Sequence, residues 1–227
     1  MFTGFPPETE QYFLDLRFHN YMAWFHETRE RYLRDVQGPF YAFIEAMLPL
    51  LTENDPQMEQ RPHKVLARIR RDTRFTKDKT PYRDHLWVWF HRAAEARQDS
   101  VGYWFEYGVS NLSWGIGTWG ECKPAMELLR REIEAHPARV SGLISSCNLG
   151  ERHLTLFNDC WKRMEVPPGV PEHLRPWYTA RRIGIQQSRP DWEAVHTERL
   201  VKLISADYEA MAPIYRLLRG LMDEATG

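Results

Sequence analysis

The sequence predicts an α+β protein with a mainly antiparallel central sheet, packed against N-terminal helices and a long C-terminal helix. A change of pattern along the chain supports this fold class. Apolar residues recur with helical spacing in the first third and near the C-terminus, whereas residues 64–119 change to the two-residue alternation of strands. Of the 227 residues, 43% are hydrophobic, which is enough to bury a core. We expect a single domain over residues 1–227.

Three helices are predicted in the first third. Pro6 and Pro7 open the first helix, because their fixed φ suits a first helical turn. The second helix runs from about residue 20 to residue 36. Gly38-Pro39 then predicts a stop and a restart. The third helix has the clearest buried stripe in the chain, formed by Phe40, Phe43, Ile44, Met47, Leu48 and Leu51.

The middle of the chain predicts a meander of antiparallel strands. These strands are expected at about residues 65–72, 85–91, 103–109 and 113–119. After them we expect a helix from about Pro124 to His136-Pro137, a loop or short helix over 166–176, a strand around 181–187 and a long helix over 198–222 that Pro213 can kink.

Charge is concentrated in one segment. The chain has 30 Lys and Arg against 31 Asp and Glu, for a net charge of −1. Residues 61–83 hold nine of the basic residues and two acids, so this segment carries +7 and the remainder −8. The overall balance argues against a protein that coats nucleic acid, while the local excess favours a site for an anion.

Several other classes of protein are not indicated. The first ten residues lack the basic and apolar regions of a signal peptide, no apolar run approaches membrane-spanning length, and three widely spaced cysteines suggest reduced thiols. We therefore expect a cytoplasmic protein without a membrane segment. Nucleotide-binding glycine loops, hydrolase elbows and zinc-protease motifs are absent from the sequence, and we predict no metal and no cofactor.

The basic segment contains a dense motif that runs from Arg68 to Tyr82, with His85 soon after it. Its core reads Arg71-Asp72-Thr-Arg74-Phe-Thr-Lys77-Asp78-Lys79-Thr-Pro-Tyr82. This string resembles the signature of a bacterial family known as domain of unknown function 2461. The likeness extends over nearly the whole chain, through Trp24-Phe25, Pro39-Phe40, Gly102-Tyr103, Gly117 with Trp119, and Trp161-Lys-Arg. The resemblance implies a compact cytosolic α+β protein, and the family offers no established activity.

The motif has two chemical interpretations. If residues 65–72 form a regular strand, Arg71 points to the apolar side and needs a carboxylate such as Asp78, or a bound anion. Two aspartates cannot neutralise all the nearby cations, so we favour a site for a small phosphate- or carboxylate-bearing ligand. Its predicted anion-binding residues are Arg68, Arg71, Arg74, Lys77 and Lys79, supported by Asp78 and Tyr82. The alternative is an internal salt-bridge staple in a structural or interaction protein.

The strand expected at residues 85–91 adds candidates of its own. His85, Trp87, Trp89 and His91 share one face, which either forms a second core layer or stacks bases or sugar rings. The third candidate function is therefore single-stranded nucleic-acid binding, which the acidic remainder of the chain disfavours. Asp72 and His85 are the candidate acid–base groups because they border the cationic motif, and Asp72 is better suited to orient an arginine. Whether the protein is an enzyme is left open.

Overall fold

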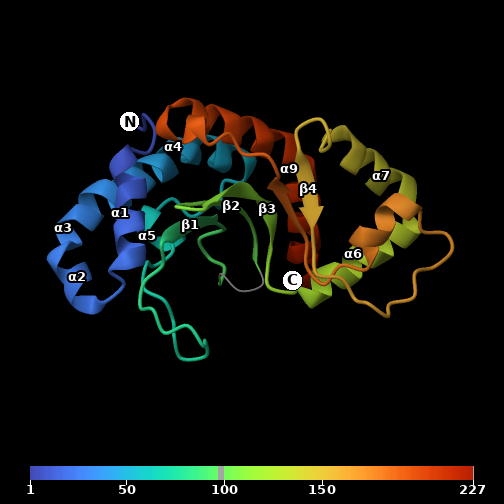
Figure 1. The fold of residues 1–227 in the computed structure, drawn as a ribbon. Coiled ribbons are helices and arrows are strands. Elements are labelled where there is room, and N and C mark those ends of the chain that lie inside the picture. The colour runs from blue at the N-terminus through green and yellow to red at the C-terminus, as the bar shows by residue number, and fades with distance from the viewer. Residues whose placement is uncertain (97–99, 227) are drawn as a thin grey trace. The chain divides into compact units, whose positions relative to one another are not determined.

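The computed structural model describes residues 1–96 and 100–226, and its ribbon is drawn in Figure 1. The helices are α1 (Pro7–Phe18), α2 (Met22–Glu27), α3 (Arg29–Tyr32), α4 (Gly38–Asn54), α5 (Pro62–Val65), α6 (Lys123–Ala135), α7 (Pro137–Ser146), α8 (Arg175–Tyr178) and α9 (Arg199–Thr226). The strands are β1 (His85–Phe90), β2 (Ser100–Gly108), β3 (Asn111–Trp119), β4 (Leu154–Phe157) and β5 (Gly184–Gln187). A π-helical turn covers Leu33–Gln37, and short 3-10 turns cover Glu172–Leu174 and Glu193–His196.

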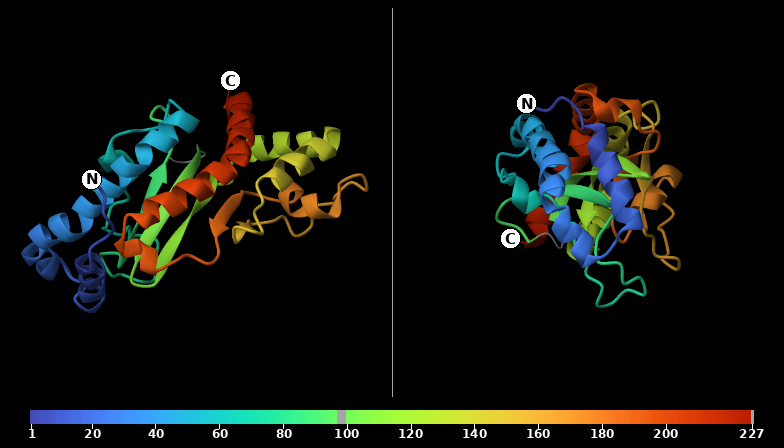
Figure 2. Two further views of the ribbon diagram at one scale, coloured as in Figure 1. Left: turned by 90° about the horizontal axis from the view of Figure 1, so that it is seen from above. Right: turned by 60° about the vertical axis from the view of Figure 1, so that its left-hand side comes forward.

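The predicted fold class is confirmed. The strands form one antiparallel sheet in the order β1-β2-β3-β5-β4, flanked in sequence by the N-terminal helices and by α9. Figure 2 shows α9 as the long orange-to-red helix that ends at the C-terminus. The described residues divide into two compact units, one of residues 1–90, 104–113 and 190–205 and one of the remaining segments. The single domain stays a prediction.

The core of the first unit contains a cluster of packed aromatic rings. Phe43 of α4 packs on Phe105 of β2 with ring centroids 4.3 Å apart, and Phe5 stacks on the same ring at 5.7 Å. Phe5 is held by its backbone N–H, which donates to the carbonyl of Val195 at 2.8 Å. Gly4 permits this approach, because it has a φ of +118° and an added Cβ would lie 2.2 Å from the His196 carbonyl carbon.

The second unit has a core of its own. Tyr103 of β2 packs against Tyr208 and Tyr215 of α9, with ring centroids 4.7 Å and 4.5 Å away. Beside them the buried carboxylate of Asp207 accepts a hydrogen bond of 2.8 Å from the indole N–H of Trp114. Strand β5 pairs with β3 through Ile185 and Ile116 and with β4 on its other edge.

Two of the predicted helix boundaries are wrong. The helix expected over residues 20–36 breaks at Thr28, whose φ of −101° and ψ of 14° leave helical geometry. Its hydroxyl donates back to the Trp24 carbonyl at 2.8 Å, a local bond that competes with the helical ladder. Gly38-Pro39 is not a stop, because both residues are helical and the π-helical turn runs directly into α4.

The π-helical turn has a clear local cause. In a regular α-helix the Asp35 carbonyl would accept from residue 39, but Pro39 has no N–H. The Gly38 N–H instead bonds five residues back to the Leu33 carbonyl. The buried hydroxyl of Thr9, on α1, donates to the Asp35 carbonyl at 2.5 Å. A donor from another helix thus compensates for the proline.

The strand expected over residues 65–72 is also not a regular strand. Its first residue ends α5, and the chain then makes only isolated bridges from Leu66 to Val88 and from Arg70 to Tyr82. The side-chain alternation nevertheless holds, since Ala67 and Ile69 are buried while Arg68 and Arg70 are exposed. Helix α7 and strand β4 were not predicted, and β5 is shorter than the strand expected at 181–187.

Candidate functional site

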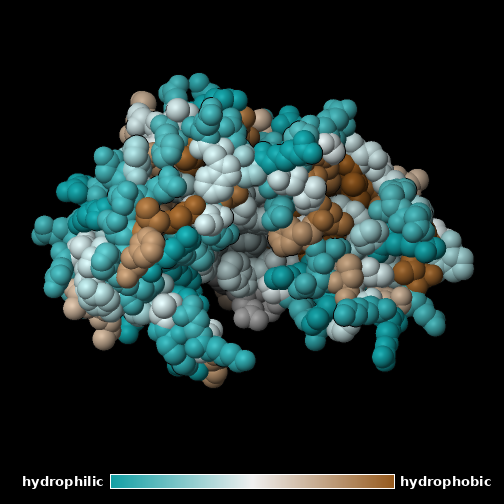
Figure 3. Space-filling model, in the orientation of Figure 1, coloured by the Kyte–Doolittle hydropathy of each residue, from teal (hydrophilic) through white to brown (hydrophobic). Residues whose placement is uncertain are grey.

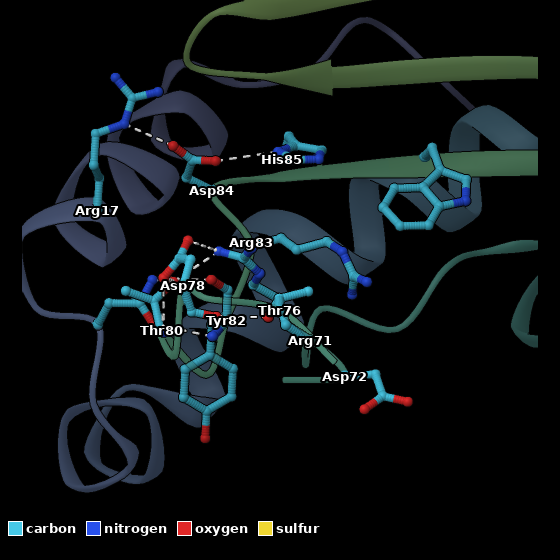
Figure 4. Close-up of a pocket in the computed structure, with 12 residues that line it drawn as sticks. Arg17, Arg71, Asp72, Thr76, Asp78, Thr80, Tyr82, Arg83, Asp84 and His85 are labelled. Carbon is cyan, nitrogen blue, oxygen red and sulfur yellow. Dashed lines mark hydrogen bonds and ion pairs between the residues drawn. The ribbon is translucent and has the colours of Figure 1, made fainter. Parts of the chain in front are cut away.

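A pocket of about 620 Å³ lies in the first unit and is lined in part by the loop of residues 72–80. The loop extends away from helices α1 to α3 in Figure 1 and has a mostly hydrophilic surface in Figure 3. The pocket is shown in Figure 4. Its lining consists of Arg17, Asn20, Arg71, Asp72, Thr76, Asp78, Thr80, Tyr82, Arg83, Asp84, His85 and Trp87.

Backbone pairing positions one wall of this pocket. The side-chain amide of Asn20 donates to the Tyr82 carbonyl at 2.9 Å and accepts from the Tyr82 N–H at 3.0 Å, as a neighbouring strand would. The Tyr82 ring stacks on Phe25 with centroids 4.2 Å apart. At the end of β2, Gly108 lets β1 come close, because an added Cβ would lie 2.3 Å from the Cβ of His85. The start of β1 is therefore tightly fixed.

Arg71 binds two residues of the loop, Asp78 and Thr80. Its guanidinium forms an ion pair with Asp78 and donates to the Thr80 hydroxyl at 2.7 Å. Asp78 also accepts from the Thr80 N–H at 2.9 Å and from the Thr80 hydroxyl at 2.8 Å. Hydrogen bonds from Thr80, then from Arg71, lower the pKa of Asp78 to about 2. Arg71 therefore has the carboxylate partner that its position demands.

Asp72 is bound by an arginine of its own loop. The Arg74 guanidinium donates to the two carboxylate oxygens at 3.0 Å and 2.7 Å, and these bonds lower the pKa of Asp72 to about 2. In Figure 4 this carboxylate lies apart from His85. Such a weak base accepts no proton near neutral pH. The geometry matches the interpretation of Asp72 as a group that orients an arginine.

Arg83 is the cation of the pocket that lacks a carboxylate partner among residues 1–96 and 100–226. Its Nη1 donates to the carbonyls of Arg68 and Arg70 at 2.9 Å and 2.8 Å, and the guanidinium lies 4.6 Å from the ring centre of Trp87. Burial, and then the positive charge of Arg71, lower the pKa of Arg83 below its ordinary value. The Nε–Nη2 edge of the guanidinium makes no hydrogen bond or ion pair in the described structure and can donate two parallel hydrogen bonds.

His85 lies between two carboxylates, Asp84 and Glu106, and Asp84 is itself bound by Arg17. Arg17 of α1 donates to one oxygen of Asp84 at 2.6 Å, and the other oxygen lies 3.1 Å from Nδ1 of His85. Nε2 of His85 lies 3.5 Å from Glu106 of β2. Burial favours the neutral acid of Asp84, but hydrogen bonds from His85 and Arg17 outweigh it and lower its pKa. The imidazole therefore has a fixed orientation at the edge of the pocket.

A sequence profile of the family described as "Conserved hypothetical protein (DUF2461)" matches residues 8–217. This match covers most of the chain. The chain belongs to the DUF2461 family. No curated protein matches it.

In this DUF2461 protein the pocket collects only part of the predicted site. Arg71, Asp72, Asp78, Tyr82 and His85 line it. The other predicted anion-binding residues lie outside its lining: Arg68 and Lys77 are exposed, Arg74 pairs with Asp72, and the Lys79 ammonium donates to the Thr73 carbonyl at 2.7 Å. The predicted five-residue clamp is therefore not assembled in this pocket.

The DUF2461 pocket also contains residues that sequence reasoning missed, chiefly Arg83, Arg17 and Asp84. Alternation was a usable signal for Arg83, because it stands two residues before His85, as Trp87 stands two residues after it. Arg17 had no such signal, since it is 67 residues away from Asp84.

Two residues on the His85 face of β1 belong to the core, and the other two line the pocket. Trp89 and His91 are buried, with exposed fractions of 3% and 8%, and belong to the core. His85 and Trp87 are half-buried and line the pocket. Within the described ranges of this DUF2461 protein no cluster of three metal-ligating side chains is found, and no helix there has the length and apolar character to span a membrane.

Proposed function

We propose that the Arg83 pocket binds a small anionic ligand through a phosphate or carboxylate group. The observation that carries this proposal is the free Nε–Nη2 edge of Arg83 in the described structure. Two carbonyls and the Trp87 ring fix the guanidinium in place without neutralising it. A fixed, partly buried fork of this kind matches an anion with two oxygens in one plane.

The neighbouring charges support this assignment. Asp78 and Asp84 are engaged by Arg71 and Arg17, so neither carboxylate neutralises Arg83. Arg83 is half-buried, and a partly buried charge is screened less by solvent and salt than an exposed one. An anion therefore gains more from Arg83 than from an exposed lysine. His85, oriented by Asp84, is the group that would exchange a proton with a bound ligand if the ligand is also processed.

The alternative of a salt-bridge staple is supported by contacts within the loop. The Arg71–Asp78 and Arg74–Asp72 pairs and the Lys79 bond to Thr73 account for most charges of residues 71–79. They stabilise the loop itself. They leave Arg83 unexplained, and for this reason we rank ligand binding first.

The test is calorimetric titration of the protein with inorganic phosphate and, separately, with acetate at constant ionic strength. Arg83→Met keeps the apolar stem against Trp87 and removes the fork. We expect it to weaken binding about tenfold or more, the usual effect of losing a charge-assisted pair of hydrogen bonds. Arg68→Met is the matched control, because Arg68 is exposed and lies outside the pocket lining.

The outcomes separate the candidate functions. Loss in Arg83→Met with retention in Arg68→Met supports the Arg83 pocket as the binding site. Equal loss in both variants would point to the motif-wide clamp expected from the sequence. No binding of either anion to the parent protein would leave the staple as the better account.

A further inference from the structure

A second pocket, of about 330 Å³, lies in the second unit and is separate from the Arg83 site in residues and in unit. It is lined by Glu121, Lys123, Met126, Glu127, Arg130, Trp161, Met164 and Arg181. Its volume is at the lower end of the range for small-molecule sites. The lining combines an apolar floor with an excess of positive charge, three cations against two carboxylates.

The apolar part of the pocket consists of the Trp161 ring and two methionine side chains. Trp161 is 41% exposed, which is unusual for tryptophan. Its backbone is held in place, because the main-chain N–H of Trp161 donates to the Thr179 carbonyl at 2.8 Å, and the Arg181 guanidinium lies 4.7 Å from the centre of the ring. Met126 and Met164 complete the floor, and thioether side chains adapt to ligands of different shape.

The polar part is the guanidinium of Arg130, on α6. Its Nε and Nη2 donate to the carbonyls of Tyr178 and Ala180, both at 3.1 Å. These two groups form one edge of the guanidinium. The opposite edge, Nη1 with the second hydrogen of Nη2, makes no hydrogen bond or ion pair in the part of the chain that the structure describes. Arg130 is thus rigidly oriented, and no carboxylate forms an ion pair with it among the described residues.

Arg181 also has an N–H group that lacks a hydrogen-bond acceptor within the described residues. One of its terminal nitrogens pairs with Glu121, but its Nε is buried without a hydrogen-bond partner within the described residues. A buried donor of this kind is costly unless something accepts its hydrogen bond. Lys123 lies 3.5 Å from the same glutamate, so Glu121 is shared between two cations.

We propose that this pocket binds an aromatic carboxylate, with the ring on Trp161 and the two methionines and the carboxylate on the free edge of Arg130. A carboxylate matches the planar fork in both charge and geometry. The ring gains contact area on a platform that is already ordered, so little side-chain freedom is lost on binding.

The probe is 1-naphthoate, titrated by calorimetry into Arg83→Met protein so that binding at the first pocket is already weakened. Binding is expected with a stoichiometry of one. Arg130→Met should weaken it about tenfold or more, and 1-naphthalenemethanol, which lacks the charge, should bind weaker by a similar factor. 1-Naphthyl phosphate tests whether the pocket prefers a carboxylate to a phosphate, and tighter binding of the phosphate would overturn the carboxylate assignment.

Two further variants make the test independent of folding effects. Arg131→Met is the matched control, because Arg131 is the exposed next residue of α6 and lies outside the pocket; its affinity should be unchanged. Trp161→Ala removes an exposed ring, leaves the Arg130 bonds to Tyr178 and Ala180 in place, and should also reduce affinity. Absence of naphthoate binding, or binding that survives both Arg130→Met and Trp161→Ala, would refute the proposal. Because Arg83 is already replaced, neither outcome bears on the first pocket.

Discussion

Asp72 and Asp78 stand six residues apart in one loop, and each is held ionised by donors of that same loop. Hydrogen bonds from Arg74 in one case and from Thr80 and Arg71 in the other lower both pKa values to about 2. A carboxylate with a lowered pKa stabilises the folded state above its unfolded pKa of about 3.9, and this contribution is lost as the pH falls through the folded value. The loop contacts should therefore persist in moderately acidic solution.

This pattern gives a residue-scale prediction for Asp78. Arg71→Met should raise the pKa of Asp78 but leave it below that of an ordinary aspartate, because the Thr80 hydrogen bonds contribute more than Arg71 does. Carboxyl-carbon NMR across the acid range measures this directly. An Asp78 that titrates like a free aspartate in the variant would show that the arginine, and not Thr80, holds the loop.

Residue-level prediction from sequence succeeded where the partner lay nearby in the chain. The need of Arg71 for a carboxylate followed from strand alternation, and Asp78 is seven residues away. Arg83 was not predicted as a site residue, because the residues next to it in the sequence do not reveal that its guanidinium bonds to main-chain carbonyls and leaves one edge without a carboxylate in the described structure. The contact of Arg17 with Asp84 depends on where α1 lies relative to the segment that precedes β1, which local patterns do not encode.

Among the elements, the junction of the π-helical turn with α4 depends most on a single side chain. The hydroxyl of Thr9, on α1, donates a hydrogen bond to the Asp35 carbonyl in this turn. Thr9→Val keeps the shape of the side chain and removes this donor. We expect a loss of about 1–3 kcal/mol in the free energy of unfolding, the usual cost of a buried acceptor left unpaired.

Urea denaturation of Thr9→Val, followed by circular dichroism, tests this expectation. Thr52→Val is the control, because the Thr52 hydroxyl bonds to the Leu48 carbonyl one turn back in its own helix. That change should cost no more than about 0.5 kcal/mol. Similar losses in the two variants would mean that the Thr9 bond has no special role.

At the element scale, sequence patterns located helices and strands better than their ends. The stripe from Phe40 to Leu51 and the alternation of β1 were sufficient to place α4 and that strand. Gly38-Pro39 was misread because a helix can continue past a proline when another segment supplies the missing donor. Residues 65–72 kept strand alternation but pair too irregularly for a strand, which depends on neighbours elsewhere in the chain.

For the whole molecule, the uneven distribution of charge decides how the third candidate function is tested. The exposed Phe75, Arg74 and Lys77 in the loop could engage a nucleic acid, yet the chain outside residues 61–83 carries −8. We predict that fluorescence anisotropy with an oligothymidine strand shows no binding tighter than micromolar at physiological salt.

The salt dependence of any complex provides the decisive comparison. If the loop does bind single strands, neutralising Arg74, Lys77 and Lys79 together should reduce the slope of log affinity against log salt by about 2. A tight, salt-sensitive complex that loses this slope would place nucleic-acid binding ahead of the small-ligand proposal.

The π-helical turn before α4 also limits how the chain can change in length. Such a turn accommodates one more residue than an α-helical turn, and each residue turns a helix by about 100°. Deleting one residue from Leu33–Gln37 would convert the turn to a regular α-helical turn and would leave the later side chains of α4 close to their present orientation. Phe40 and Phe43 would then stay in the aromatic cluster around Phe105. A deletion within α4 has no such turn to absorb it and would rotate every later side chain by that angle, so homologues that keep this core can differ by one residue at the π-helical turn but not between Phe40 and Phe43.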